Sequence, residues 1–144
     1  MWYPIAEDLL YKHLPVIVNA WYPGEQGGTA VAEVLFGDYN PAGRLSLTYY
    51  KFLEELPPFD DYDITKGRTY KYFKGDVLYP FGYGLSYTTF EYGDLRPSAT
   101  TLRRGEKVTV EVSVTNTGGM DGAETVHWFI SDPVCRISRP VREL

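Results

Sequence analysis

The sequence carries two hydrophobic patterns of different kinds, and each is too short for the fold that it indicates. Residues 14–21 form a nearly continuous apolar run, which is typical of a strand buried on both faces of a parallel sheet. Residues 108–115 alternate valine with polar side chains, which predicts a half-buried strand. A chain of 144 residues cannot bury two complete cores. We therefore expect parts of two domains, and an α+β mixed fold class.

The apolar run belongs to a β-turn-α unit. The pattern predicts a short helix over residues 5–13 before the run and a glycine-rich turn over residues 23–28 after it. A second helix is predicted over residues 29–36, and Gly37 suits the left-handed position just past its end. Residues 1–50 are therefore predicted to be the C-terminal part of an α/β domain.

The alternating strand opens the last segment, residues 86–144. A turn is predicted over residues 116–122, and residues 126–130 then place Val, Trp and Ile on one face of a second strand. Strands joined by turns, with few helix signals, predict an antiparallel β-sandwich of the immunoglobulin or fibronectin type. Such a sandwich needs about seven strands, so this domain is expected to be incomplete.

Between these segments, residues 51–85 show weak periodicity and many tyrosines and glycines. Long loops without regular structure are uncommon in compact domains unless they carry a function or join domains. We expect an ordered connector that packs through its aromatic side chains. These are Tyr70, Tyr72, Phe73, Tyr79, Phe81 and Tyr83.

Charge and hydropathy argue against two kinds of partner. The net charge is −5 and no Lys/Arg-rich run is present, so nucleic-acid binding is not expected. The apolar stretches are far shorter than the roughly 18 residues that span a bilayer, so no membrane association is expected. Residues 1–4 show no signal-peptide pattern, and the sequence leaves the compartment undetermined.

The residues that usually bind metals are sparse. Cys135 is the single cysteine, and His13 and His127 lie far from it in sequence, so neither a disulfide nor a structural zinc site is expected. The acidic residues 60–63 lack the spacing and the closing glutamate of a calcium loop. We predict no metal and no cofactor.

Three blocks of the sequence resemble one enzyme family in the same order. Residues 20–28 (AWYPGEQGG) and 34–45 (VLFGDYNPAGRL) closely resemble the end of the α/β-sandwich domain of family 3 glycoside hydrolases. Residues 67–73 (GRTYKYF) and 78–90 (LYPFGYGLSYTTF) resemble the connector that follows it. Residues 114–118 (VTNTG) resemble the opening strands of the family's fibronectin type III-like domain. The sequences of the first two blocks are closer to the β-glucosidase and β-xylosidase branches than to the N-acetylglucosaminidase branch.

This resemblance implies a parent enzyme that removes β-linked glucose or xylose from oligosaccharides or glycosides with retention. In the family, the nucleophile lies in an N-terminal barrel and the acid/base lies earlier in the α/β-sandwich domain. Neither motif occurs in this sequence, and residues 1–12 match the preceding family strand poorly. No catalytic residue is therefore assigned, the chain is expected to be inactive alone, and the missing barrel is a candidate partner.

Five residues are candidates for substrate binding. Trp21 and Tyr22 could stack on a sugar ring, and Glu25 follows the predicted parallel strand, where ligands of α/β sheets bind. Arg68 and Tyr70 could hydrogen-bond to sugar hydroxyls.

Each candidate also has a purely structural interpretation. Trp21 and Tyr22 could pack between domains, and Glu25 could stabilise the start of the following helix. Arg68 could pair with one of the acidic residues 60–63, and His127 is expected to be a surface or interdomain residue. Two rival functions stay open: a non-catalytic β-sandwich module that binds carbohydrate or mediates adhesion, and a structural piece that completes a partner chain carrying the barrel.

Overall fold

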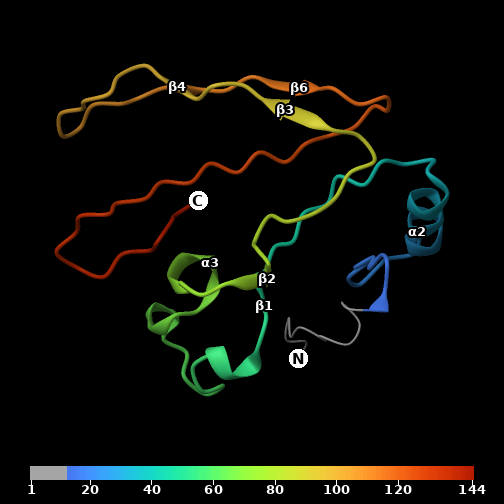
Figure 1. Ribbon diagram of the computed structural model, residues 1–144, viewed down its shortest axis with the longest axis horizontal. Coiled ribbons are helices and arrows are strands. Elements are labelled where there is room, and N and C mark those ends of the chain that lie inside the picture. Colours follow the sequence, from blue (N-terminus) through green and yellow to red (C-terminus); the bar gives the residue numbers. More distant parts are fainter. Residues whose placement is uncertain (1–12) are drawn as a thin grey trace. The chain divides into compact units, whose positions relative to one another are not determined.

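The computed structural model describes residues 13–144 (Figure 1). Its internal contacts divide the chain into two compact units. The first, here called the connector unit, comprises the chain up to Gly28, Gly43–Leu85 and Thr125–Leu144. The second, here called the ribbon unit, comprises Thr29–Ala42 and Ser86–Glu124. The helix predicted over residues 5–13 lies outside the described residues, apart from His13.

Helix α2, Gly27–Phe36, confirms the helix predicted over residues 29–36 and begins two residues earlier. The Gly27 amide donates to the Gly24 carbonyl at 3.0 Å, which closes the glycine-rich turn before it. Gly37 has a φ of +83°, the left-handed conformation that commonly ends a helix. The last residues of the helix leave their apolar side chains in solvent, and Phe36 is 84% exposed.

The strand predicted over residues 14–21 is not formed in the described chain. These residues take no regular structure, and their side chains are exposed, Val16 by 70%. A strand forms only when its main-chain groups find a neighbouring strand, and no strand of the described residues pairs with this run. The prediction that this run is a strand buried on both faces is therefore wrong for this structure. Its apolar side chains have no surface that covers them among the described residues.

The connector unit contains a short antiparallel pair that the sequence analysis did not predict. Strand β1, Tyr49–Tyr50, pairs with β2, Val77–Tyr79, with a register shift between its two residues. The pairing extends to Leu45, whose amide donates to the Tyr83 carbonyl at 2.8 Å. Residues 45–50 and 77–83 of the connector unit are thereby held side by side.

Three short helical turns fill the chain between β1 and β2. They are the 3₁₀ helices η1, Leu53–Glu55, and η2, Ile64–Lys66, and the one-turn helix α3, Thr69–Tyr72. Around them the aromatic rings pack in pairs. Tyr50 and Phe73 meet edge to face at 4.9 Å between ring centroids, and Tyr70 and Phe81 stack at 4.4 Å. The prediction that this segment is ordered through its aromatic side chains is confirmed.

The second strand predicted over residues 126–130 is wrong for the described chain, where only an isolated bridge joins Ile130 to Glu143. Instead, Phe129 lies edge-on to Tyr70 at 5.8 Å and His127 lies edge-on to Phe81 at 5.3 Å. Alternating apolar residues predict a sheet face, but here Val126, Trp128 and Ile130 are exposed, and the residues between them pack on the rings of the connector. Residues 125–144 group with the connector unit.

The ribbon unit contains a long two-stranded antiparallel ribbon (Figure 1). Strand β3, Phe90–Tyr92, pairs with β6, Val114–Asn116. Strand β4, Arg96–Pro97, pairs with β5, Val110–Glu111.

The strand predicted over residues 108–115 is thus present but interrupted, and its partner is the preceding segment rather than residues 126–130. The chain as described is a small mixed structure with antiparallel strand pairs. In the described part, no helix is both long and apolar enough to cross a membrane.

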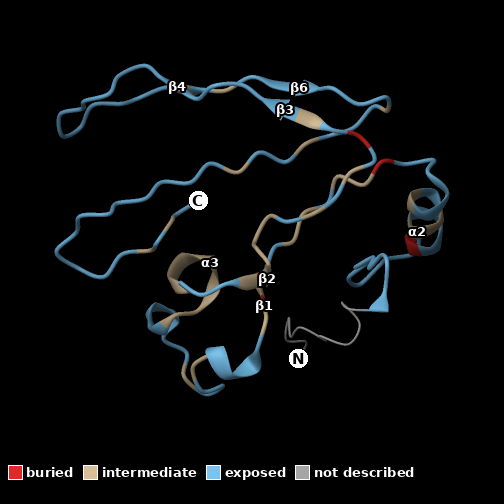
Figure 2. Cartoon of the chain, in the orientation of Figure 1, coloured by how far each residue is buried: buried red, intermediate tan, exposed pale blue. Residues whose placement is uncertain are grey.

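Buried side chains are few (Figure 2). Among the described residues, Tyr50 is the one large apolar side chain that is buried, at 8% exposure. Asn40, Thr48 and Thr88 are each 6% exposed and polar. The hydrophobic core formed by residues 13–144 is therefore thin, as the incomplete sequence patterns predict.

Candidate functional site

The loop before α2 presents two large aromatic rings to solvent. Trp21 is 49% exposed and Tyr22 is 80% exposed. Trp21 adopts a φ of +52°, which is rare for a bulky residue, and its amide donates to Asn19 Oδ1 at 3.1 Å. The Asn19 amide nitrogen in turn donates to the Tyr49 hydroxyl at 2.9 Å. The loop that carries the two exposed rings is therefore tied to β1 through Asn19.

Glu25 lies in the turn before α2, with an exposed side chain. The first turn of α2 contains no acidic residue, so Glu25 stands outside the helix. Its carboxylate lies in the same loop as Trp21 and Tyr22, and the three residues form one exposed group, here called the loop group.

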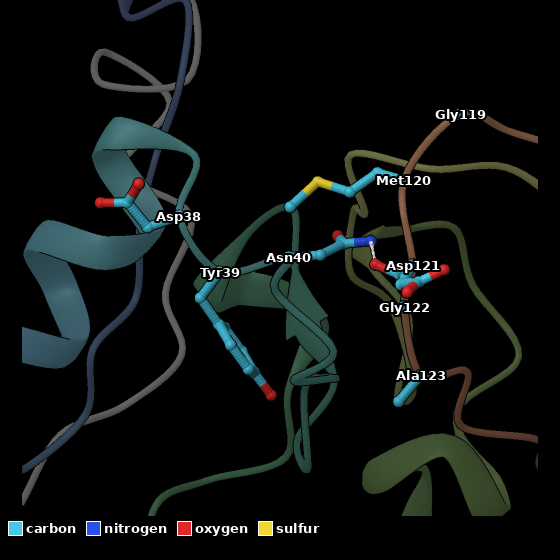
Figure 3. Close-up of a pocket in the computed structure, with 8 residues that line it drawn as sticks. All are labelled: Asp38, Tyr39, Asn40, Gly119, Met120, Asp121, Gly122 and Ala123. Carbon is cyan, nitrogen blue, oxygen red and sulfur yellow. Dashed lines mark hydrogen bonds between the residues drawn. The ribbon is translucent and has the colours of Figure 1, made fainter.

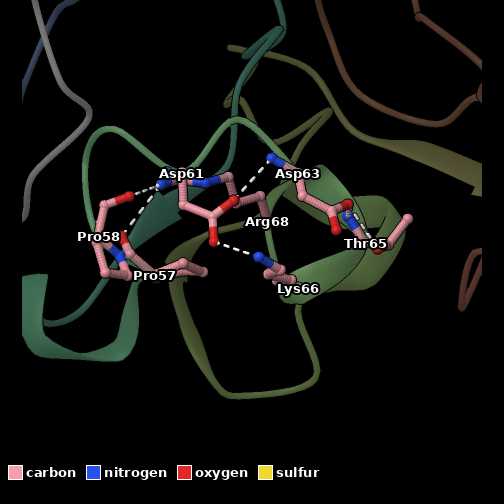
Figure 4. A network of polar contacts seen from close by, with 7 residues as sticks. All are labelled: Pro57, Pro58, Asp61, Asp63, Thr65, Lys66 and Arg68. Carbon is pink, nitrogen blue, oxygen red and sulfur yellow. Dashed lines mark hydrogen bonds and ion pairs between the residues drawn. The ribbon is translucent and has the colours of Figure 1, made fainter.

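Arg68 does not form the ion pair that the sequence analysis considered. Its Nη2 donates to the carbonyl of Pro57 at 3.1 Å and to that of Pro58 at 2.6 Å (Figure 4). Asp61 pairs with Lys66 instead, at 2.6 Å. The expected Arg68–carboxylate pair is therefore wrong. Both bonds come from Nη2, and they fasten the proline turn to the start of α3.

Asp63, one of the acidic residues near Arg68, caps the 3₁₀ helix η2. Asp63 accepts hydrogen bonds from the Thr65 amide at 3.0 Å and from the Thr65 hydroxyl at 2.6 Å (Figure 4). These bonds hold the pKa of Asp63 below its ordinary value. The hydrogen bond from Lys66 lowers the pKa of Asp61 and raises that of Lys66.

The substitution Lys66→Gln is expected to raise the pKa of Asp61 toward its ordinary value. The folded pKa of Asp61 lies below its unfolded value, so the contact stabilises the fold above the unfolded pKa. That contribution is lost as the pH falls through the folded pKa. An NMR titration of the Asp61 carboxyl carbon measures the change. Lys51→Gln is the matched control, because Lys51 contacts Asp76. An Asp61 pKa equal in both variants would contradict the assignment.

Tyr70 is engaged in packing. One face of its ring stacks on Phe81 and its edge region meets Phe129. It also lines a cavity of about 310 Å³ together with Thr48, Phe73, Lys74 and Arg142. The Thr48 hydroxyl oxygen is buried and has no hydrogen-bond partner in the described structure. Ring packing therefore fixes the Tyr70 side chain, which forms part of the wall of this cavity.

The five sequence candidates do not converge on one site. Trp21, Tyr22 and Glu25 lie in the loop before α2, and Arg68 and Tyr70 lie around α3. No hydrogen bond or ring contact of the described residues joins the two sets. The described residues also contain no group of three or more His, Cys, Asp or Glu side chains that could hold a metal ion.

The sequence analysis missed a polar centre in the ribbon unit. Asn40 is buried and sits beside an open cavity lined by residues 38–40 and 119–123 (Figure 3). The cavity measures about 670 Å³. In Figure 3 the Asn40 amide points toward the main chain at Asp121, to which it donates at 3.1 Å. The Asp-Tyr-Asn-Pro sequence is typical of a turn, and an asparagine in a turn gives no sign of its long-range partners.

The comparison with known protein families identifies the chain. Residues 3–87 match the model of the "Glycosyl hydrolase family 3 C-terminal domain". The chain belongs to this family of glycoside hydrolases, and the resemblance found in the sequence is confirmed.

Curated relatives support the same family over most of the chain. A xylan 1,4-beta-xylosidase of Xylanibacter ruminicola is 58% identical over 114 residues, which cover 79% of this chain and 13% of that protein. A periplasmic beta-glucosidase of Salmonella typhimurium is 41% identical over 97% of this chain and 19% of its own length. The chain thus spans less than a fifth of these relatives.

Solved structures agree. A β-glucosidase of Erythrobacter marinus superimposes with a TM-score of 0.78 at 40% identity, covering 94% of this chain and 18% of that one. Beta-glucosidase 3B of Thermotoga neapolitana, solved with glucose, gives a TM-score of 0.70 at 33% identity over 85% of this chain and 19% of that one. These matches favour a glycosidase origin over a free-standing binding or adhesion module.

Proposed function

We propose that this chain is the C-terminal scaffold of a retaining, exo-acting β-glycosidase of the β-glucoside or β-xyloside type, and that it is inactive alone. The observation that carries the proposal is the family match over residues 3–87 combined with coverage of less than a fifth of the relatives. The remaining four fifths of such an enzyme have room for the catalytic carboxylates and the substrate pocket.

Two of the described carboxylates, Asp61 and Asp63, are poor candidates for the proton donor. Retaining hydrolysis needs two carboxyl groups about 5–5.5 Å apart, one of them a proton donor with a raised pKa. Asp61 and Asp63 are instead occupied by hydrogen bonds from Lys66 and Thr65, and their pKa values are lowered. A lowered pKa keeps a carboxyl ionised, which is the wrong state for protonating a leaving group.

Within the parent enzyme, we assign residues 1–50 to the end of the α/β-sandwich domain and residues 51–85 to the connector. Residues 86–144 are assigned to the opening part of a fibronectin type III-like domain. The helix α2, the aromatic packing of the connector and the antiparallel ribbon support this division.

The loop group, Trp21, Tyr22 and Glu25, is the part of this chain that we propose for the rim of the sugar pocket. Its rings are exposed, the Trp21 amide donates to Asn19, and exposed aromatic rings are suited to stacking on sugars. Arg68 and Tyr70 are occupied by the proline turn and by Phe81, so any contact of theirs with substrate would be secondary.

Complementation tests the proposal. The chain is expected to hydrolyse neither aryl β-glucosides nor aryl β-xylosides alone, but to restore turnover when co-expressed with the upstream part of a family 3 β-xylosidase. The upstream part alone is the control. Restored turnover that falls with Tyr22→Ala, while the two parts still co-purify, supports the rim assignment. Turnover by the chain alone that a single carboxylate substitution abolishes would overturn the proposal.

A further inference from the structure

Asn40 is an unusually well-enclosed polar residue for so exposed a chain. It is 6% exposed, whereas Tyr39 beside it is 54% exposed. Its side-chain oxygen accepts from the Ser86 hydroxyl and from the Tyr87 amide, each at 2.8 Å. Its side-chain nitrogen donates to the Asp121 carbonyl at 3.1 Å. One amide group therefore bonds to two segments that lie 46 and 81 residues further along the chain.

The side-chain amide of Asn116, at the start of the turn over residues 116–122, makes a second set of bonds. Thr88, also 6% exposed, donates its hydroxyl to Asn116 Oδ1 at 2.7 Å. Asn116 Oδ1 also accepts from the Gly118 amide at 3.1 Å, and Asn116 Nδ2 donates to the Met120 carbonyl at 2.9 Å. The turn over residues 116–122 is thus held by Asn116 from within and by Asn40 from outside.

The turn fits Asn40 closely. A Cβ added at Gly122 would meet Asn40 Nδ2, and a Cβ added at Gly118 would meet the Thr88 side chain and the Thr89 amide. Both positions therefore require glycine, because the neighbouring atoms leave no room for a Cβ. The Tyr87 hydroxyl also donates to the Val34 carbonyl at 2.6 Å, in the last turn of α2. Residues 86–87 therefore bond both to α2 and to Asn40.

We propose that Asn40 is a positioning residue that locks the 116–122 turn and the start of the ribbon onto the segment that carries α2. The joint between helix and ribbon is then rigid rather than a flexible linker. A buried amide whose donor and acceptor are both used discriminates against every replacement, because each substitution leaves a buried group unpaired. The inference goes beyond the proposed glycosidase function and does not depend on it.

Two variants of Asn40 separate the lock from general destabilisation. Asn40→Asp keeps an oxygen to accept from Ser86 and Tyr87 but cannot donate to the Asp121 carbonyl. Asn40→Ala removes all three bonds. Asn19→Ala is the matched control, because Asn19 is exposed and bonds to Tyr49 in the connector unit.

The readouts are amide exchange at Tyr87 and the distance between two spin labels, measured on the monomeric fraction. The labels are placed at Glu33→Cys, on α2, and at Gly119→Cys, where an added side chain meets open space, in a Cys135→Ser background. Asn40→Ala is expected to accelerate exchange at Tyr87 about tenfold to hundredfold, the equivalent of one buried group left unpaired. It is also expected to broaden the label distance distribution.

Asn40→Asp is expected to broaden the label distances while Tyr87 still exchanges slowly, because only the bond to the turn is lost. If Asn40→Ala does not fold, Asn40→Asp alone carries the test. Label distances as narrow in Asn40→Asp as in Asn19→Ala would overturn the proposal.

Discussion

Produced alone, the 144-residue chain is expected to self-associate and to lack a sharp thermal transition. The run over residues 14–21 exposes apolar side chains together with main-chain groups that pair with no strand of the described structure. Phe36 and Leu35 at the end of α2 are 84% and 60% exposed. Unpaired strand edges and exposed apolar faces both promote association, and a thin core provides little stability to oppose it.

Size-exclusion chromatography with light scattering over a range of concentrations measures this association. Ile17→Lys is expected to shift the chain toward monomer, because a charge within this exposed apolar run opposes its pairing with the same run of a second molecule. Thr101→Lys, at an exposed position in the loop between β4 and β5, is the matched control for added charge. A monomeric chain that melts sharply and reversibly above about 60 °C, the upper range for mesophilic domains, would contradict the prediction.

The elements that could be predicted from the sequence are those fixed by local chemistry. Helix α2 follows from the spacing of its apolar residues and from Gly37, whose φ of +83° suits a helix end. The order of the connector follows from its density of aromatic residues, which need partners to be buried. The family resemblance was likewise carried by contiguous motifs, and residues 3–87 confirm it.

The elements that were mispredicted depend on partners distant in the sequence. The run over residues 14–21 has the composition of a buried strand, but composition cannot supply the neighbouring strands that a parallel sheet requires. Residues 126–130 alternate as a strand would, yet Phe129 and His127 pack on Tyr70 and Phe81. Period-two patterning indicates that alternate side chains share a face, and not which surface covers that face.

The candidate site shows the same division. Trp21 and Tyr22 are exposed and their contact with a ligand stays a prediction, whereas Arg68 bonds to main-chain carbonyls rather than to the nearby carboxylates. A guanidinium can satisfy its donors with either kind of oxygen, so the sequence alone could not decide between them. Asn40 was missed because its partners lie 46 to 81 residues away.

Truncation of Tyr50 is expected to have the largest effect on the stability of the connector unit. Tyr50 is 8% exposed, its ring meets Phe73 at 4.9 Å, and its hydroxyl accepts from the Thr69 amide at 2.7 Å. Thr69 has a φ of +61°, a strained conformation for a β-branched residue, which the bond to Tyr50 helps to hold. Removal of a buried aromatic ring typically costs about 3–5 kcal/mol, and loss of a single partner to a buried amide about 1–3 kcal/mol.

We therefore expect Tyr50→Ala to remove the slow amide exchange of the connector unit in the monomeric fraction, and Tyr50→Phe to accelerate exchange mainly at Thr69. Tyr62→Ala and Tyr62→Phe are the matched controls, because Tyr62 is 82% exposed.

Burial raises the pKa of Tyr50, so the folded state holds its proton more tightly than the unfolded state does. The stability due to Tyr50 is then complete below the unfolded pKa and is lost as the pH rises through the folded pKa. Tyr50→Phe should abolish this alkaline component, and an unchanged alkaline profile would show that the Tyr50 hydroxyl is not the group responsible.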